Sequence, residues 1–465
     1  MWQTQDARAC FVSIRARVLV GILLCIDSVP GPAQEGLATE QWKFDELHLT
    51  NGTIFTGLIV DETPAVVRFK IVIRPPGEST RTLLQRFERK QIQRIVRLDQ
   101  EDRKTLAQRL RTLQPGYEQE QMDLLKLTRV PWGHGSKEFG LSYTSDYFVL
   151  VSNAGELIIK RAALRLEQVY AAYARCILPR QQTSQPTRIR LIRSLGEYHK
   201  ALAERGQRIL NPAFYDRDRN EIVCASELER LHVDLEKTRK ENKEVSDRLK
   251  QDEKRVHKLP KGKEREDQLA KLAADRQRLE QTNRQNDRVF EKATERLFQT
   301  LYHEAFHAYL ANYVYPPGQT DIPRWLNEGL AQIFETAVLE AGELRVGHAD
   351  GKRLADVKNA LRERKLVALK DLLQSGPMEF LVAHVGDQRV SDRYYLASWA
   401  LAFYLTFELK KLGMPELNCY VCALKQQQKD PLKAFEQLVG QPLDEFELTF
   451  HEYLRQLRSN GESGG

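Results

Sequence analysis

The segment that most constrains the fold is residues 226–297, where 37 of 72 residues are charged. Apolar and small polar residues recur there at three- and four-residue spacing, which is the heptad pattern of a coiled-coil seam. The first seam comprises Leu228, Leu231, Leu235, Thr238, Asn242, Val245, Leu249, Asp252, Val256 and Leu259. The second comprises Leu269, Leu272, Arg276, Leu279, Asn283, Asn286, Phe290, Ala293 and Leu297.

A Leu-Pro-Lys-Gly break at residues 259–262 separates the two seams. We therefore predict an antiparallel coiled-coil hairpin inserted at 226–297. Folding about the break places Asn242 opposite Asn283, and a polar pair of this kind fixes the register. The alternative interpretation is a solvated charged linker.

The N-terminus has the layout of a secretory signal peptide. An apolar run at residues 18–26 follows Arg15 and Arg17 and precedes small residues up to Ala33. We expect cleavage after residue 33 and a secreted or periplasmic protein, whereas the alternative is a buried strand. No apolar run reaches membrane-span length, so we expect no transmembrane span in the mature chain.

Residues 40–100 alternate between apolar and polar positions and contain the turn signals Asn51-Gly52 and Pro75-Pro76-Gly77. This pattern predicts a small SH3-like or Sm-like β-barrel, a type of domain that usually binds or docks. Residues 101–126 are expected to form a helical connector. Residues 147–152 and 157–160 are expected to pair as a β-hairpin within a mixed region that extends to residue 225.

The charge balance gives no reason to expect nucleic acid as a partner. Lys plus Arg number 71 and Asp plus Glu number 64, a net charge of +7. Basic and acidic residues are interleaved instead of forming a basic stripe, as on the solvated flanks of a coiled coil.

The chemistry lies in residues 302–307, Tyr-His-Glu-Ala-Phe-His. On a helix, His303 and His307 are four residues apart and face the same side, so both imidazoles can hold one metal ion. Glu304 lies on the adjoining flank, where its carboxylate can reach a metal-bound water. The chain contains no proline between Pro260 and Pro316, so the second hairpin arm is expected to continue into this helix.

Residues 323–331, Pro-Arg-Trp-Leu-Asn-Glu-Gly-Leu-Ala, extend the pattern. They resemble the W-x-x-E-G-x-A signature of the gluzincins, the zinc peptidases that include thermolysin-like enzymes and zinc aminopeptidases. The resemblance implies that Glu328 is the third zinc ligand. Residues 393–405 resemble the downstream helix of the peptidase-MA-like branch, in which a tyrosine supports the site. Tyr395 matches that position best, with Tyr394 as the second choice.

The whole layout also resembles an uncharacterised bacterial secreted family with this domain at its C-terminal end. It implies an α+β fold: a zincin-like, mostly helical catalytic domain with a small mixed sheet, formed by residues 140–225 and 298–458. The β-barrel would precede this domain and the coiled-coil hairpin would interrupt it. No G-x-M-E-N segment precedes His303, which argues against an aminopeptidase and for an endopeptidase-like enzyme.

Three further residues are expected to support the ligands. Gln332 stands four residues after Glu328, where the clan often has an acid that orients a metal-bound His, and its carbonyl can accept an imidazole N–H. Glu335 lies two turns after Glu328 and is either such a support or a solvated charge. Asn327 is expected to cap or brace the chain beside the ligand.

The predicted function is a secreted zinc metallopeptidase. Zn²⁺ held by His303, His307 and Glu328 would activate a water, and Glu304 would act as general base. Tyr395 would donate to the developing oxyanion, although packing in a core helix is an equally good interpretation. Partners would be a protein or peptide substrate and a protein bound through the hairpin or the barrel. The alternative is a weak or inactive zincin-fold scaffold that binds a partner through these two parts.

Overall fold

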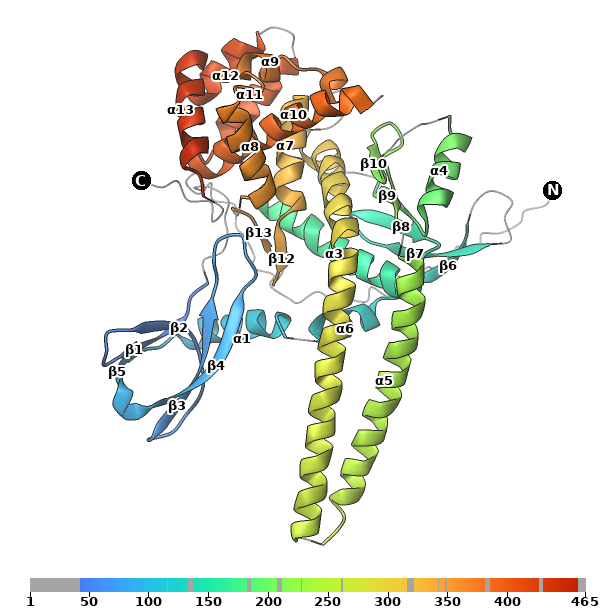
Figure 1. Cartoon of the computed structure of the whole chain (residues 1–465), viewed down its shortest axis with the longest axis vertical. Helices are drawn as coiled ribbons and strands as arrows, with labels where there is room; N and C mark the ends of the chain where they lie inside the picture. Colours follow the sequence, from blue (N-terminus) through green and yellow to red (C-terminus); the bar gives the residue numbers. More distant parts are fainter. Residues whose placement is uncertain are drawn as a thin grey trace, which may run out of the picture. The chain divides into compact units, whose positions relative to one another are not determined.

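The computed structural model has a mixed α+β fold, as the sequence predicts (Figure 1). It describes residues 42–114, 116–132, 138–181, 185–206, 211–226, 228–260, 262–315, 322–341, 343–347, 349–380, 385–425 and 430–458. The predicted signal peptide, residues 1–33, lies outside the described residues. Within the described part of the chain, no helix combines the length and hydropathy needed to cross a membrane.

The first folded part is a five-stranded antiparallel sheet in the order β4-β3-β2-β1-β5. Its strands are β1 (Asp45–Leu49), β2 (Ile54–Glu62), β3 (Val66–Ile73), β4 (Arg81–Glu88) and β5 (Ile92–Val96). Gly52 has φ 84°, which permits the tight turn between β1 and β2. A 3₁₀ turn (Arg89–Gln91) follows β4.

The prediction of a closed barrel is wrong for this sheet. No ladder between β4 and β5 is present among the described strands, so the sheet stays open at both edges. The reason lies in β4, where Phe87 alone of the eight residues is buried. β4 therefore contributes little to the core of this sheet, which a closed barrel would require of every strand.

The predicted connector is helical and consists of α1 (Gln100–Thr112) and α2 (Tyr117–Leu124). Leu106 and Leu110 of α1 pack against Trp42, which precedes β1, and Val72 of β3. From α2, Glu118 pairs with two arginines of the next helix, at 2.9 Å from Arg161 and 3.0 Å from Arg165. The connector therefore joins the open sheet to the body that holds the candidate site.

A second sheet has the order β10-β11-β9-β8-β7-β6. Its strands are β6 (Thr128–Pro131), β7 (Phe139–Thr144), β8 (Phe148–Ser152), β9 (Thr187–Ile192), β10 (Ala213–Asp216) and β11 (Glu221–Ala225). β8, β9 and β11 are parallel, and the outer pairs are antiparallel. Helix α3 (Glu156–Cys176) contributes to the core with β8 and β9, and α4 (Leu195–Glu204) packs with β9 and β11 in a separate cluster.

The prediction of a β-hairpin across residues 153–156 is wrong for its second strand. Residues 157–160 form the first turns of α3. Ile158 and Ile159 are both buried, because this helix is covered on more than one side. A helix buried in this way shows an unbroken apolar run that sequence periodicity cannot distinguish from a strand.

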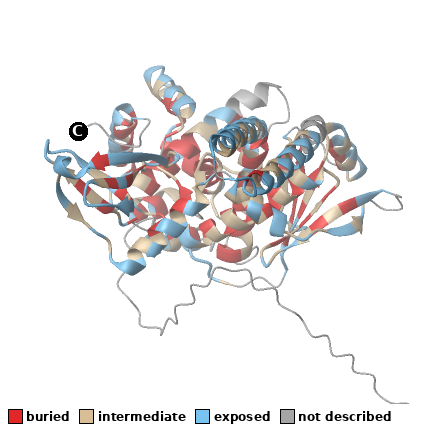
Figure 2. Ribbon diagram, turned by 90° about the horizontal axis from the view of Figure 1, so that it is seen from below, coloured by how far each residue is buried: buried red, intermediate tan, exposed pale blue. Residues whose placement is uncertain are grey.

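Two long helices follow, α5 (Glu229–Val256) and α6 (Lys263–Tyr309). The Nδ2 of Asn242 donates to the Oδ1 of Asn283 at 2.7 Å, which confirms the predicted register and the antiparallel direction. In Figure 2 the two arms, seen nearly end-on, are largely pale blue, as expected for helices that bury a narrow seam. The second arm continues without interruption into the HExxH segment, also as predicted.

The remaining chain is mostly helical and completes the core around α3 and α6. Its elements are a short π-helix (Leu310–Val314), α7 (Arg324–Glu335), β12 (Val338–Glu340), β13 (Glu343–Arg345), α8 (Gly351–Arg362), α9 (Leu369–Leu373), a 3₁₀ turn (Pro377–Phe380), α10 (Val385–Phe403), a second short π-helix (Tyr404–Glu408), α11 (Pro415–Lys425), α12 (Pro431–Val439) and α13 (Leu443–Gln456).

Helices α7 and α10 cross closely at Gly329. A Cβ added at this glycine would lie 2.4 Å from the carbonyl oxygen of Ser398 and 2.7 Å from the Cβ of Ala402. No residue larger than glycine fits there without moving a helix. Since Gly329 follows Glu328 directly, this crossing sets where the Glu328 carboxylate points.

Candidate metal centre

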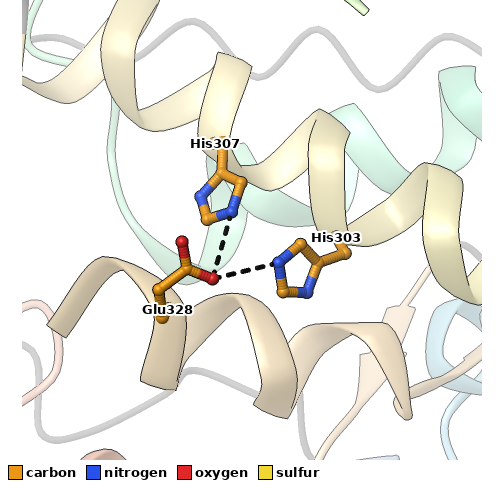
Figure 3. A group of neighbouring side chains, drawn as sticks. All are labelled: His303, His307 and Glu328. Carbon is orange, nitrogen blue, oxygen red and sulfur yellow. Dashed lines mark hydrogen bonds and ion pairs between the residues drawn. The ribbon is translucent and has the colours of Figure 1, made fainter. Parts of the chain in front are cut away.

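Two helices bring the candidate ligands together. α6 carries His303 and His307, and α7 carries Glu328, which points between the two imidazoles (Figure 3). The ring centroids of the histidines are 4.7 Å apart and the rings are nearly perpendicular, at 87°. The four-residue spacing on one helix thus produces the shared face that the sequence predicted.

The ligand atoms converge on one small volume. The Oε2 of Glu328 lies 3.2 Å from the Nε2 of His303 and 3.6 Å from the Nε2 of His307. One ligand atom from each of the three residues lies within 4.8 Å of the others. Glu328 is 1% exposed, so its carboxylate has almost no contact with solvent.

These distances suit a metal ion with nitrogen and oxygen ligands. Zinc binds His nitrogen and carboxylate oxygen at about 2.0–2.2 Å in a tetrahedron, which places neighbouring ligand atoms about 3.3–3.6 Å apart. The separations of 3.2 and 3.6 Å from Glu328 to the two imidazoles are close to that range. Two neutral imidazoles and one carboxylate match the donors of catalytic zinc sites, which keep a fourth position open.

The second nitrogen of each imidazole is also engaged. The Nδ1 of His303 lies 2.6 Å from the Oε2 of Glu335, and the Nδ1 of His307 lies 2.9 Å from the Oδ1 of Asn327. Both acceptors require Nδ1 to carry the proton, which leaves each Nε2 directed at Glu328. Glu335 is held in turn by an ion pair with Arg353 of α8. Asn327 therefore contacts His307 itself instead of capping the chain, and of the two roles considered for Glu335 the structure shows the contact with His303.

The expectation for Gln332 is wrong. Its Nε2 donates to the backbone carbonyls of Glu328, at 3.2 Å, and Tyr395, at 2.9 Å, and contacts no imidazole. The side chain is buried and faces α10, because that side of α7 packs on α10. The residue that orients His303 is Glu335, one turn farther along α7.

The electrostatics of the cluster favour a carboxylate and charged imidazole when no metal is present. Burial raises the pKa of Glu328, but His307, His303 and Arg324 outweigh it and hold that pKa well below its usual value. Burial lowers the pKa of His303, and the carboxylates of Glu328 and Glu335 raise it well above the usual value. A divalent cation bound here would replace this imidazolium charge opposite Glu328.

Arg324 was not anticipated from the sequence. Its Nη2 lies 2.7 Å from the Oε1 of Glu328, and its side chain is 43% exposed. The pair follows from four-residue spacing at the start of α7, a signal that the sequence does contain. It occupies one carboxylate oxygen and leaves the other for the imidazoles. Arg353 carries no comparable signal, because it lies 18 residues beyond Glu335.

The two candidate tyrosines, Tyr394 and Tyr395, have different charged neighbours. Burial raises the pKa of Tyr395, the Glu328 carboxylate raises it further, and its hydroxyl contacts Arg324. Tyr394 instead has Asp371, Glu379 and Arg393 as its charged neighbours. Tyr395 is therefore the tyrosine beside the metal-binding cluster, with its phenol held in the protonated form.

Glu304 follows His303, and its side chain forms no hydrogen bond or ion pair with another described residue. Burial raises the pKa values of Tyr395, Tyr198 and Cys224, and the nearby Glu304 carboxylate raises all three further. A carboxylate without a fixed partner beside His303 and His307 is available to accept a proton.

Comparison with known proteins places the site in a recognised but uncharacterised segment. Residues 298–416 match a family model described as "Protein of unknown function (DUF1570)". No curated protein matches the chain. The matched span contains the site end of α6, all of α7, the β12–β13 pair and Tyr395, whereas the five- and six-stranded sheets and most of the helical hairpin lie outside it.

Proposed function

We propose that this protein is a secreted zinc-dependent peptidase of the gluzincin type, with a zincin-like catalytic domain. The observation that carries the proposal is the convergence of His303, His307 and Glu328, with Glu304 unengaged beside them. Three protein ligands are typical of catalytic zinc sites, whereas structural sites close the coordination with a fourth.

The chain's own residues supply the rest of the chemistry. When bound, zinc lowers the pKa of a coordinated water and polarises a carbonyl group. Glu304 takes the proton of the attacking water on its carboxylate and returns it to the leaving nitrogen. Tyr395, protonated because of its burial beside Glu328, donates a hydrogen bond to the carbonyl oxygen as negative charge develops there.

Three features of the sequence support the proposed substrate class and location. The W-x-x-E-G-x-A resemblance around Glu328 favours a peptide bond, and the absence of a G-x-M-E-N segment before His303 favours internal cleavage. The signal-peptide pattern at residues 1–33 supports an activity outside the cytoplasm.

The proposal is tested by measuring zinc and hydrolysis on the same preparations. Elemental analysis of the purified protein should give about one zinc per chain. Glu328→Ala should reduce this content, and Glu304→Gln should retain it. A peptide library should then be cleaved by the parent protein, with cleavage about 10²–10⁴-fold slower for Glu304→Gln.

Each failure has a distinct meaning. A parent protein that stays free of zinc after zinc is added back would overturn the metal site. Zinc bound with no cleavage of any library peptide would favour the scaffold alternative, in which the open sheet and the hairpin carry the function.

A further inference from the structure

The strand β4 (Arg81–Glu88) presents a free edge. One side of it pairs with β3 along a continuous register from Val66 opposite Glu88 to Ile73 opposite Arg81. Among the described strands, none pairs with its other side. β4 contains no proline and its ladder has no bulge. A long, regular edge without these protections is a template for pairing with another strand.

Exposed apolar side chains flank this edge on both faces. Leu83 is 58% exposed and Leu84 is 49% exposed, and neighbouring positions on a strand point to opposite faces. Ile73, 51% exposed, lies diagonally across from Leu83 on the same face. A strand laid along β4 would therefore cover apolar surface above and below the sheet.

Basic residues outnumber acidic ones on the two strands at this edge, with Arg68, Lys70, Arg81 and Arg86 against Glu88, although Asp61 of β2 lies opposite Arg68. Arg68 of β3 and Arg86 of β4 lie directly opposite one another, and both are exposed. Neither forms an ion pair with a described residue, whereas Arg89 and Arg97 nearby both pair with Glu62. Like charges opposite each other across a ladder are destabilising. An acidic residue on a strand added along the free edge would lie beside Arg86 and offset that cost.

We propose that the free edge of β4 binds an extended, acidic segment of a partner protein by strand addition. Backbone N–H and C=O groups on β4 supply the hydrogen bonds, which select a peptide over other polyanions. On the face that carries Arg86, acidic side chains of the segment lie beside this arginine, and on the opposite face its apolar side chains cover Leu83. The inference goes beyond the proposed peptidase activity and does not depend on it.

The binding edge is tied to the helix that carries Glu328. The β3–β4 connection contacts the β12–β13 hairpin through Arg74 and Glu343, at 3.0 Å, and through the backbone N–H of Thr80 and Glu340, at 2.8 Å. Arg345 pairs with Glu340 at 2.7 Å, and both side chains are nearly buried. β12 follows α7 closely in the chain. The strand to which the segment would bind is therefore connected, through β12–β13, to the helix that carries Glu328.

The test uses the full chain and a fluorescently labelled peptide in which Glu alternates with Val. Fluorescence anisotropy should show saturable binding, and the matched peptide with Lys in place of Glu should bind about tenfold more weakly or not at all. Arg86→Glu should weaken binding of the Glu peptide by about tenfold. This variant creates an opposite-charge pair with Arg68, so it should keep the fold, which thermal unfolding checks.

Two controls separate strand addition from charge attraction. Arg94→Glu makes the same charge change on β5, at the other edge of the sheet, and should leave binding unchanged. A Glu–Val peptide with every second amide N-methylated, prepared in both alternating patterns, should lose binding in one pattern, because methylation removes the hydrogen bonds on one edge of the peptide.

Equal binding of both methylated peptides and the parent peptide would overturn the proposal, since charge alone would then explain the interaction. No binding of the Glu peptide, or equal loss in Arg94→Glu and Arg86→Glu, would also overturn it.

Discussion

Replacing Glu335 by Gln should weaken zinc binding even though Glu335 is not a ligand. Its Oε2 accepts the Nδ1–H of His303 at 2.6 Å, and the pair is largely buried. The carboxylate fixes the ring and raises the basicity of the nitrogen that faces the metal. Gln keeps the shape and the hydrogen bond but removes the charge.

The magnitude follows from that difference. A hydrogen bond to a charged group contributes about 1.5–3 kcal/mol and a neutral one about 0.5–1.5 kcal/mol. Loss of charge assistance at His303 should therefore cost about 1–1.5 kcal/mol of binding free energy, which is about a tenfold rise in the zinc Kd. Glu335→Ala should cost more, within the 10–100-fold range of lost ligand supports, because it also leaves Arg353 unpaired.

Gln332→Ala is the matched control. Gln332 lies on the same helix, is buried, and donates to backbone carbonyls, so its loss should lower thermal stability by about 1 kcal/mol while the zinc Kd stays unchanged. Competition with a chelating dye measures the Kd for all variants. An unchanged Kd in Glu335→Gln, or an equal rise in Gln332→Ala, would refute the assignment of Glu335 as the residue that orients His303.

Three further outcomes are expected. Gly329→Ala should destabilise the fold by about 1–3 kcal/mol in thermal unfolding, because its Cβ meets the backbone of α10, whereas Gly196→Ala, with open space around it, should not. Burial raises the pKa of Glu118, but two arginines outweigh it and hold the pKa below its usual value. Glu118 therefore stabilises the fold above its unfolded pKa, and this contribution is lost as pH falls through the folded pKa. Glu118→Gln should cost about 1–3 kcal/mol at neutral pH and flatten the acid side of the stability profile in denaturant titrations. Replacing Asn242 and Asn283 together by Leu should raise the melting temperature but permit slipped or intermolecular pairing, detected as oligomers by light scattering.

The parts of the fold that depend on local spacing could be predicted from the sequence. The heptad seams fixed the register of the long hairpin down to one asparagine pair, Asn242 and Asn283. Whether the first sheet closes into a barrel could not be predicted, because closure depends on pairing between β4 and β5, and no local sequence pattern specifies that pairing. Residues 157–160 were misassigned because α3 is buried on more than one side, which hides helical periodicity.

The candidate site shows the same division. His303 and His307 share a helix face by spacing alone, and their convergence with Glu328 followed from a second local signature. The supports did not follow, because the crossing of α6, α7 and α10 decides which residue of α7 reaches an imidazole. That crossing turns Gln332 toward Tyr395 and brings Glu335 to His303.

The two parts outside the matched family segment reach the metal-binding cluster through different helices. The hairpin continues as α6, which carries His303 and His307. The open sheet is bonded to β12–β13, which follows α7 and therefore Glu328. Each side of the ligand set is therefore connected to a different part of the molecule. Because coupling between binding sites is reciprocal, a partner that alters the zinc affinity must have its own affinity altered by zinc to the same extent.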